Sequence, residues 1–143
     1  MPAEFHYSHL NRALRKGSAQ DRDRFAPQIL VLTSALQKLH GYLGKGSRNT
    51  FLSDERRAQL VPGAIFSDPG FSSAVVGDHS GYWTDDRPNT VLDIESKNRG
   101  RLVPSPNQTF GGAELLFLPG ARFRVKQVEQ MKWGVRAALV EIE

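Results

Sequence analysis

The stretch that decides the fold is residues 111–125, Gly-Gly-Ala-Glu-Leu-Leu-Phe-Leu-Pro-Gly-Ala-Arg-Phe-Arg-Val. It contains a strand-like apolar run with a carboxylate directly before it. Two glycines free the backbone just before Glu114, and the leucines and phenylalanine that follow have the composition of a buried strand. A carboxylate in this place is expected to be partly desolvated, which increases its electrostatic reach. Glu114 is therefore a candidate functional residue. The alternative is that it ends a polar loop and points to water.

The chain has the length of one domain and contains no cysteine. A chain of 143 residues buries roughly 68–70% of its unfolded surface, so we predict a single domain over residues 1–143. The lack of cysteine excludes disulfides, thiolate zinc sites and cysteine nucleophiles. No apolar run reaches the ~18 residues that cross a bilayer, and the first residues do not form a secretory signal. We predict a soluble domain without a membrane partner.

The formal net charge of +4 is distributed unevenly. Residues 1–60 hold ten Lys and Arg against five Asp and Glu, whereas residues 61–143 hold nine against ten. The N-terminal part therefore carries the field that would attract a polyanion or an acidic partner.

Helices are predicted in the N-terminal part of the chain, residues 1–60. The first spans residues 6–16. A second begins near Pro27, which suits a first turn, and ends at Gly44. Its apolar positions recur at three- and four-residue spacing: Ile29, Leu32, Leu36, Leu39 and Leu43. Ser53 is the predicted N-cap of a short third helix.

Strands are predicted in residues 61–143, where short β-branched and aromatic segments alternate with turn residues. The predicted strands are Ala64–Ser67, Gly70–Val76, Thr90–Glu95, Ala113–Leu118, Arg122–Glu129 and Trp133–Ile142. Helices followed by strands predict an α+β fold, with N-terminal helices packed on a mostly antiparallel double sheet. The long polar connections 77–89 and 96–112 are expected to be functional.

Three positions in chain order carry a family resemblance. They are Arg48 in Gly-Ser-Arg-Asn-Thr-Phe, Ser73 in Asp-Pro-Gly-Phe-Ser-Ser-Ala-Val, and Glu114 before Leu-Leu-Phe-Leu-Pro-Gly. This pattern resembles the Arg–Ser–Glu signature of mono-ADP-ribosyltransferases, over about three quarters of the chain. The resemblance implies that family's split β-sandwich and NAD⁺ as co-substrate, without a metal.

The resemblance also implies a role for each of the three residues. In this family the bond between nicotinamide and ribose breaks through a transition state with positive charge on the ribose, as in glycoside hydrolysis. Glu114 would stabilise that charge, and Arg48 would hold the phosphates of the dinucleotide. Ser73 would position the glutamate. Further cofactor-binding candidates that the resemblance implies are Asn49, Phe71, Tyr82, Trp83 and Arg87.

Two departures from the family pattern concern the later serine and the acceptor. Val75 stands where the family has the later serine of Ser-Thr-Ser. Gly112 stands where members that modify arginine carry Glu or Gln, which puts an arginine acceptor in doubt. Basic side chains near Glu114 would bind a phosphate backbone, so we predict a structured RNA hydroxyl slightly ahead of a protein side chain. The acceptor-binding candidates are Lys97, Arg99, Arg101, Phe110 and Gly112.

The resemblance to bacterial effector domains places the chain in a biological setting. We expect a toxin module that is delivered as part of a larger protein, acts in the cytoplasm of the target cell and is blocked by an immunity protein. Two alternatives remain open. An NAD glycohydrolase would use the same Arg48 and Glu114 with water as acceptor, and a non-catalytic nucleic-acid-binding module would not need Glu114.

Overall fold

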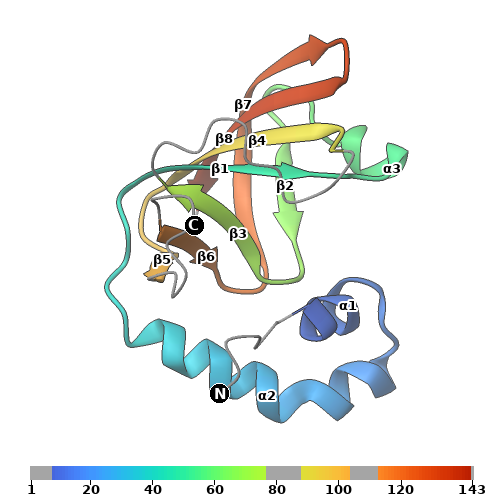
Figure 1. Cartoon of the computed structure of the whole chain (residues 1–143). Coiled ribbons are helices and arrows are strands. Elements are labelled where there is room, and N and C mark those ends of the chain that lie inside the picture. The colour runs from blue at the N-terminus through green and yellow to red at the C-terminus, as the bar shows by residue number, and fades with distance from the viewer. Residues whose placement is uncertain (1–7, 77–87, 104–112, 143) are drawn as a thin grey trace.

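The computed structural model describes residues 8–76, 88–103 and 113–142. The helices are α1 (Ser8–Lys16), α2 (Ala19–Gln37) and α3 (Asp54–Arg57). The strands are β1 (Gly44–Thr50), β2 (Ile65–Asp68), β3 (Ser72–Val76), β4 (Thr90–Ser96), β5 (Gly100–Val103), β6 (Ala113–Phe117), β7 (Ala121–Met131) and β8 (Gly134–Ile142). Figure 1 shows α1 and α2 together on one side of a curled sheet, with α3 at the end of β1. The predicted α+β class is confirmed.

Helix α2 differs from the prediction at both ends. It begins after the N-cap Ser18, whose side chain accepts from the Asp21 N–H while the Asp21 carboxylate accepts from the Ser18 N–H. This capping box fixes the start eight residues before Pro27, which lies inside the helix. The helix ends at Gln37, so the predicted continuation to Leu43 is wrong. The predicted Ser53 cap of α3 is confirmed.

The eight described strands form one mixed sheet in the order β2-β7-β8-β4-β1-β3-β6-β5. Among them only β4 and β8 pair in parallel, and the last strand, β8, lies between β7 and β4. The sequence did not predict β1 or β5. Strand β1 reads Gly-Lys-Gly-Ser-Arg-Asn-Thr, which has no apolar alternation, and β5 falls within the connection 96–112.

The sheet curls until its two ends pack against each other. Within the described residues, β1 and β3 share the single register pair Ser47–Val75, which divides the sheet as a split sandwich requires. Phe117 of β6 contacts Phe123 of β7 edge to face, at 5.1 Å between ring centroids, although these strands are not neighbours in the sheet. The main core therefore fills the inside of the curl.

A second, smaller core joins the helices to β3 and β6. Leu10 and Leu36 from α1 and α2 pack against Phe71 and Leu116. This contact fixes α1 beside the start of β3, where the candidate site lies. No helix among the described residues is long and apolar enough to cross a membrane.

Candidate active site

Arg48, Ser73 and Glu114 come from three strands that lie side by side, β1, β3 and β6. Glu114 pairs with Val75, and Ser73 pairs with Leu116, so Ser73 and Glu114 are diagonal neighbours on one face of the β3–β6 pair. Ser47, which precedes Arg48, pairs with the same Val75. The fold therefore brings the three predicted residues to the place where β1 joins β3. Glu114 is partly buried there.

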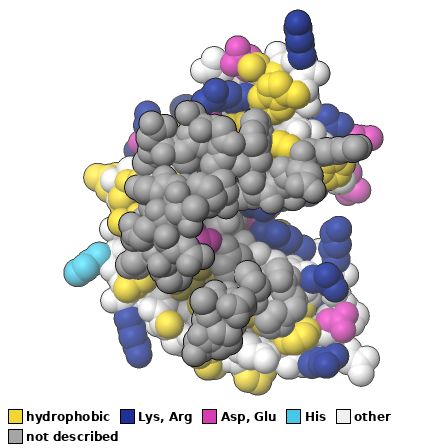
Figure 2. Space-filling view, in the orientation of Figure 1, with side chains coloured by type: hydrophobic (Ala, Val, Ile, Leu, Met, Phe, Trp, Pro, Cys, Tyr) yellow, Lys and Arg dark blue, Asp and Glu magenta, His cyan; other side chains and the backbone are white. Residues whose placement is uncertain are grey.

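Two adjoining pockets open between α1 and the sheet. The Ser73 pocket, of ≈ 350 Å³, is lined by Asn11, Arg12, Arg15, Lys16, Arg48, Phe71 and Ser73. The Phe51 pocket, of ≈ 290 Å³, is lined by Arg15, Lys16, Arg48, Thr50, Phe51, Leu52, Ser53, Arg56, Phe66, Asp68 and Leu92. Figure 2 shows a hollow at the right of the molecule with Lys and Arg side chains around it. Arg15, Lys16 and Arg48 line both pockets and form the boundary between them.

Five cations surround these pockets, and we call Arg12, Arg15, Lys16, Arg48 and Arg56 the pocket cluster. Asp68 is the one carboxylate among the described residues that line either pocket. The cluster therefore has excess positive charge inside a concave surface, which is the electrostatic requirement for binding a pyrophosphate.

Asp68 holds two of the cations. Arg15 donates to both of its oxygens, Nε to Oδ1 at 2.8 Å and Nη2 to Oδ2 at 2.7 Å, and Arg48 Nη1 lies 3.5 Å from Oδ2. The Gly70 N–H and the Ser72 hydroxyl donate to the same carboxylate. Burial alone would raise the pKa of Asp68, but the hydrogen bonds and charge of Arg15 outweigh burial, and the pKa lies below its ordinary value. Asp68 therefore stays ionised and joins α1 to β1.

Asn11 fixes α1 to the chain just before β3. Its side-chain amide donates to the Phe71 carbonyl at 3.0 Å and its oxygen accepts from the Phe71 N–H at 2.6 Å. Arg15 Nη2 donates to the same carbonyl at 3.0 Å. One face of α1 is thus a wall of the site, held by side-chain to backbone hydrogen bonds.

Arg56 lines the Phe51 pocket, and its guanidinium stacks on an aromatic ring. Its guanidinium carbon lies 4.3 Å from the centre of the Phe66 ring, Nη2 donates to the Ser67 carbonyl at 2.7 Å, and Nη1 donates to Gln59. Burial lowers the pKa of Arg56, and the charge of Asp68 opposes that shift. The guanidinium plane is therefore fixed in orientation.

Only some of the predicted cofactor-binding residues line the two pockets. Arg48 and Ser73 line one pocket. Asn49, the next residue on β1, is half-buried and lines neither pocket. Phe71 is 1% exposed and packs in the second core, so its ring offers little surface to a ligand. Tyr82, Trp83 and Arg87 lie outside the described residues.

The predicted acceptor-binding residues Lys97, Arg99 and Arg101 follow the C-terminal end of β4 and line neither of the two pockets. We call them the turn cluster. Lys97 pairs with Glu95, Arg99 lies 3.9 Å from the Glu141 carboxylate, and Arg101 donates to the Leu36 carbonyl at the end of α2. Each side chain has a local partner, and its role in acceptor binding stays a prediction. Phe110 and Gly112 lie outside the described residues.

Sequence reasoning missed four residues that shape the site: Asn11, Arg15, Arg56 and Asp68. Arg15 falls in the predicted helix 6–16, and nothing in the sequence indicated that it lines a pocket. A signal for Asp68 was present, because this aspartate closes an apolar segment just before Pro-Gly and would be buried there unless it were paired. Within the described ranges, no group of three His, Asp or Glu side chains could hold a metal ion.

Comparisons with known proteins give relatives by sequence and by structure, whereas no family model matches the chain. The sequence is 26% identical over 110 residues to the ADP-ribosyltransferase Vis of Vibrio splendidus (strain 12B01), whose full name gives NAD⁺ and arginine as proposed substrates. The alignment covers 71% of this chain and 44% of Vis, so the chain spans less than half the length of that relative.

Solved structures with the same fold include Vis and two further bacterial proteins. Vis with the inhibitor M6 has a TM-score of 0.77 at 21% identity, covering 96% of this chain and 67% of that one, and Vis has also been solved with agmatine. HopU1 of Pseudomonas syringae pv. Tomato DC3000 has a TM-score of 0.73 at 20% identity, covering 95% and 65%. Exoenzyme S of Pseudomonas aeruginosa, bound to human 14-3-3 protein beta and carba-NAD, has a TM-score of 0.73 at 20% identity, covering 97% and 68%.

These relatives share the fold in which Arg48, Ser73 and Glu114 lie on three adjacent strands of this chain, and the roles of the three residues stay a prediction. They give no support to the predicted preference for RNA, since Vis is named for an arginine acceptor. The resemblance inferred from the sequence is confirmed, and the chain has the fold of bacterial ADP-ribosyltransferase toxins.

Proposed function

We propose that the chain is an NAD⁺-dependent mono-ADP-ribosyltransferase that modifies a protein side chain. The observation that carries the proposal is the meeting of Arg48 and Ser73 in one pocket, with Glu114 diagonal to Ser73. These residues lie beside a cationic pocket cluster that suits a dinucleotide. The named activity of Vis supports the proposal.

In the proposed reaction the bond between the ribose C1′ and the nicotinamide nitrogen breaks, and nicotinamide leaves with the bonding electrons. Positive charge then develops on C1′ and the ring oxygen. The partly buried Glu114 carboxylate stabilises this charge more in the transition state than in the ground state, which lowers the barrier. The acceptor atom attacks C1′ and releases its proton.

Arg48 and Ser73 would orient the dinucleotide and the glutamate. A guanidinium holds phosphate oxygens through two parallel N–H donors, and the Asp68 carboxylate lies 3.5 Å from one nitrogen of the Arg48 guanidinium. Ser73, on the same face as Glu114, supplies a hydroxyl for positioning and not for attack. Precise placement of C1′ against the acceptor accounts for a large part of the expected rate enhancement.

A protein side chain is favoured over an RNA hydroxyl by two observations. Vis has been solved with agmatine, a small guanidinium compound. In addition, the turn cluster expected to bind RNA is engaged with Glu95, Glu141 and the Leu36 carbonyl. Gly112 leaves open which side chain is modified, and agmatine can be tested directly as an acceptor.

The test is incubation of the wild-type protein and a Glu114→Gln variant with NAD⁺ labelled in the ADP-ribose part and a total cell lysate. We expect wild-type label in protein, and at least a hundredfold less with the variant, because the amide keeps the shape but loses the charge. Label in RNA would overturn the protein acceptor. Free ADP-ribose alone would indicate an NAD glycohydrolase. An active Glu114→Gln variant would overturn the mechanism.

We further propose that the domain acts as a delivered toxin in the cytoplasm of a target cell. Vis is named as a toxin, and exoenzyme S binds a human 14-3-3 protein in its crystal structure. Induced expression in the cytoplasm of bacterial and yeast cells tests this proposal. Growth should stop with the wild-type protein and continue with Glu114→Gln, and equal growth of both strains in both hosts would contradict it.

A further inference from the structure

Helix α1 carries two rows of polar side chains with different surroundings. Asn11 and Arg15 form the inner row, which is hydrogen-bonded to Phe71 and Asp68. Arg12 and Lys16 form the outer row, four residues apart and therefore neighbours on the helix surface. Both are exposed, and neither has a hydrogen bond or an ion pair within the described residues. We call Arg12 and Lys16 the α1 rim.

The charge of the α1 rim is not compensated by the helix itself. Helix α1, Ser8–Lys16, contains three cations and no acidic residue. Two like charges at this spacing destabilise a helix slightly, and the one carboxylate that lines the pockets, Asp68, is paired with the inner row and with Arg48. Uncompensated charge at the edge of a concave surface attracts a partner of opposite charge.

The pocket cluster has more positive charge than the pyrophosphate of NAD⁺ neutralises. Its five cations exceed the one lining carboxylate by four charges. A pyrophosphate carries one negative charge on each phosphate, so about half of this excess remains when the dinucleotide is bound. Arg15, Arg48 and Arg56 are partly buried, so the exposed part of the cluster is the α1 rim.

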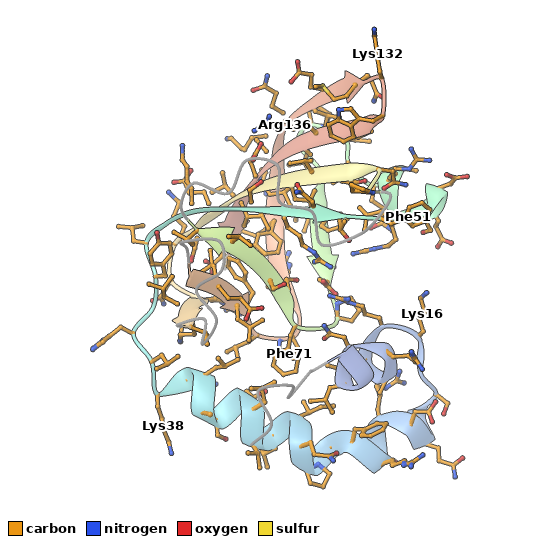
Figure 3. All side chains as sticks on the ribbon, in the orientation of Figure 1. Lys16, Lys38, Phe51, Phe71, Lys132 and Arg136 are labelled. Carbon is orange, nitrogen blue, oxygen red and sulfur yellow. The ribbon has the colours of Figure 1, made fainter. Side chains whose placement is uncertain are left out.

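The α1 rim also lies where an acceptor would approach. Both of its residues line the Ser73 pocket, and Ser73 is diagonal to Glu114. In the proposed reaction the acceptor atom attacks the ribose beside Glu114, so the surface around this pocket must receive the rest of the acceptor protein. Figure 3 shows Lys16 at the end of α1, next to the hollow that Figure 2 shows.

We propose that the α1 rim is a docking surface for the acceptor, and that the acceptor is a protein with acidic side chains around the residue that is modified. This inference rests on the proposed function and names the class of its substrate. Opposite charges on the two surfaces speed their encounter and orient the acceptor. Arg12 and Lys16 then determine specificity and take no part in bond breaking.

The α1 rim fits an acidic protein better than RNA. Proteins that bind a phosphate backbone gain affinity with each phosphate that they neutralise, and two cations neutralise few. The turn cluster does not extend the α1 rim, because it lines neither pocket and its members have their own partners. A folded acceptor needs only single carboxylates opposite Arg12 and Lys16.

The test measures the rate of labelling of two acceptor mixtures at saturating NAD⁺ that is labelled in the ADP-ribose part. One lysate is separated by anion exchange into acidic and basic proteins, and each mixture is offered to the wild-type protein and to the double variant Arg12→Glu/Lys16→Glu. The wild-type protein should label acidic proteins faster. The charge reversal should lower the ratio of the acidic to the basic rate about tenfold, because it repels acidic acceptors and attracts basic ones. A ratio taken within one enzyme cancels any change in its affinity for NAD⁺.

The matched control is Lys38→Glu/Lys132→Glu, which makes the same change in net charge. Both lysines are exposed and line neither pocket, and Figure 3 shows them at the end of α2 and at the tip of the β7–β8 hairpin. The ratio should stay roughly within twofold of the wild-type value, because salt screens charges away from the pockets. Thermal denaturation checks that each variant is folded. If the charge reversal does not fold, Arg12→Gln/Lys16→Gln should still lower the ratio about threefold.

The outcomes separate this inference from the proposed function. A ratio that is unchanged in the charge reversal, or that falls equally in the control, would overturn the docking surface and leave the transferase proposal intact. Label in added RNA that is lost in the charge reversal would show that the α1 rim binds RNA instead. A wild-type protein that labels neither mixture would overturn the proposed protein acceptor itself.

Discussion

The pocket cluster and the turn cluster lie at opposite ends of β1 and β4, and both consist of Arg and Lys side chains. In the pocket cluster, five cations surround one lining carboxylate, Asp68, inside a concave surface. In the turn cluster, each cation has its own acceptor: Glu95, Glu141 or a backbone carbonyl. The number of positive charges therefore does not identify a phosphate site. The ratio of cations to carboxylates, together with the shape of the surface, is the reason why we propose the pocket cluster as the phosphate site.

The largest expected effect comes from removing the charge of the carboxylate in the pocket cluster. Asp68→Asn leaves Arg15 without its buried partner, and breaking such a pair should lower the free energy of unfolding by about 3 kcal/mol. Thermal denaturation should then shift by roughly 10 °C. Asp93→Asn is the matched control, because Asp93 pairs with Arg136 at a more exposed site. Equal effects of the two changes would contradict this account.

Asp68 should also make stability depend on pH. Its pKa is lowered by folding, so its contribution is complete above its ordinary pKa of 3.8 and is lost as pH falls below 3.8 through the lower folded value. The wild-type protein should therefore lose stability in this acidic range more steeply than Asp68→Asn. Parallel curves of unfolding free energy against pH would show that Asp68 does not carry this dependence.

Arg48→Lys tests whether the pocket cluster recognises phosphate by geometry. A lysine ammonium keeps the charge but cannot make two parallel hydrogen bonds, so the dissociation constant for NAD⁺ should rise about tenfold. Calorimetry measures the change. Lys45→Arg on the same strand is a control, because Lys45 is exposed and lines neither pocket. An unchanged affinity in Arg48→Lys would mean that another arginine holds the phosphates.

Glu141→Gln should destabilise the fold around the turn cluster without changing the affinity for NAD⁺. The Glu141 carboxylate is 2% exposed and accepts the backbone N–H groups of Lys97, Asn98 and Arg99. An amide would direct its own N–H groups at some of these donors, at a cost of about 1–3 kcal/mol. Urea denaturation should show this loss while calorimetry gives the wild-type affinity for NAD⁺. A weaker affinity would connect the two clusters.

The smallest effect is expected from the exposed side chains of the turn cluster. Lys97 and Arg99 are both about half exposed, and Glu141 keeps its backbone N–H donors in the double change to Ala, so little stability is lost. Thermal stability should change by no more than about 2 °C, and NAD⁺ cleavage by less than twofold. A large loss of protein modification with normal NAD⁺ cleavage would instead support the predicted acceptor role of these residues.

The parts of the fold that the sequence predicts are those with local signals. Helix α1 and the Ser53 cap have side-chain patterns that act within one or two turns. Strand β1 does not, because its pairing with β4 and β3 involves residues far away in the chain. Gly46 explains its composition: a Cβ there would lie 3.1 Å from the Cβ of Ala74 and 3.3 Å from Leu115. Close packing between the strands favours glycine at this position, whereas in the sequence alone a glycine indicates a turn.

The residues of the candidate site also fall into two groups, those with a signal in the sequence and those that depend on long-range contacts. Arg48, Ser73 and Glu114 were found through their resemblance to a known signature, in which order along the chain is enough. Asp68 and Arg15 are 53 residues apart, and their ion pair depends on how α1 docks on the sheet. Long-range side-chain pairing of this kind leaves no periodic pattern in the sequence, so only the fold could reveal it.

The position of β8 between β7 and β4 has a consequence for how the chain folds during synthesis. The last described strand along the chain is central in the sheet, so β4 lacks its parallel neighbour until the residues up to Ile142 have emerged from the ribosome. Non-local pairing of this kind slows folding and leaves strand edges exposed in the meantime. The nascent domain should therefore remain open to chaperones and proteases until β8 has left the ribosome and paired with β4.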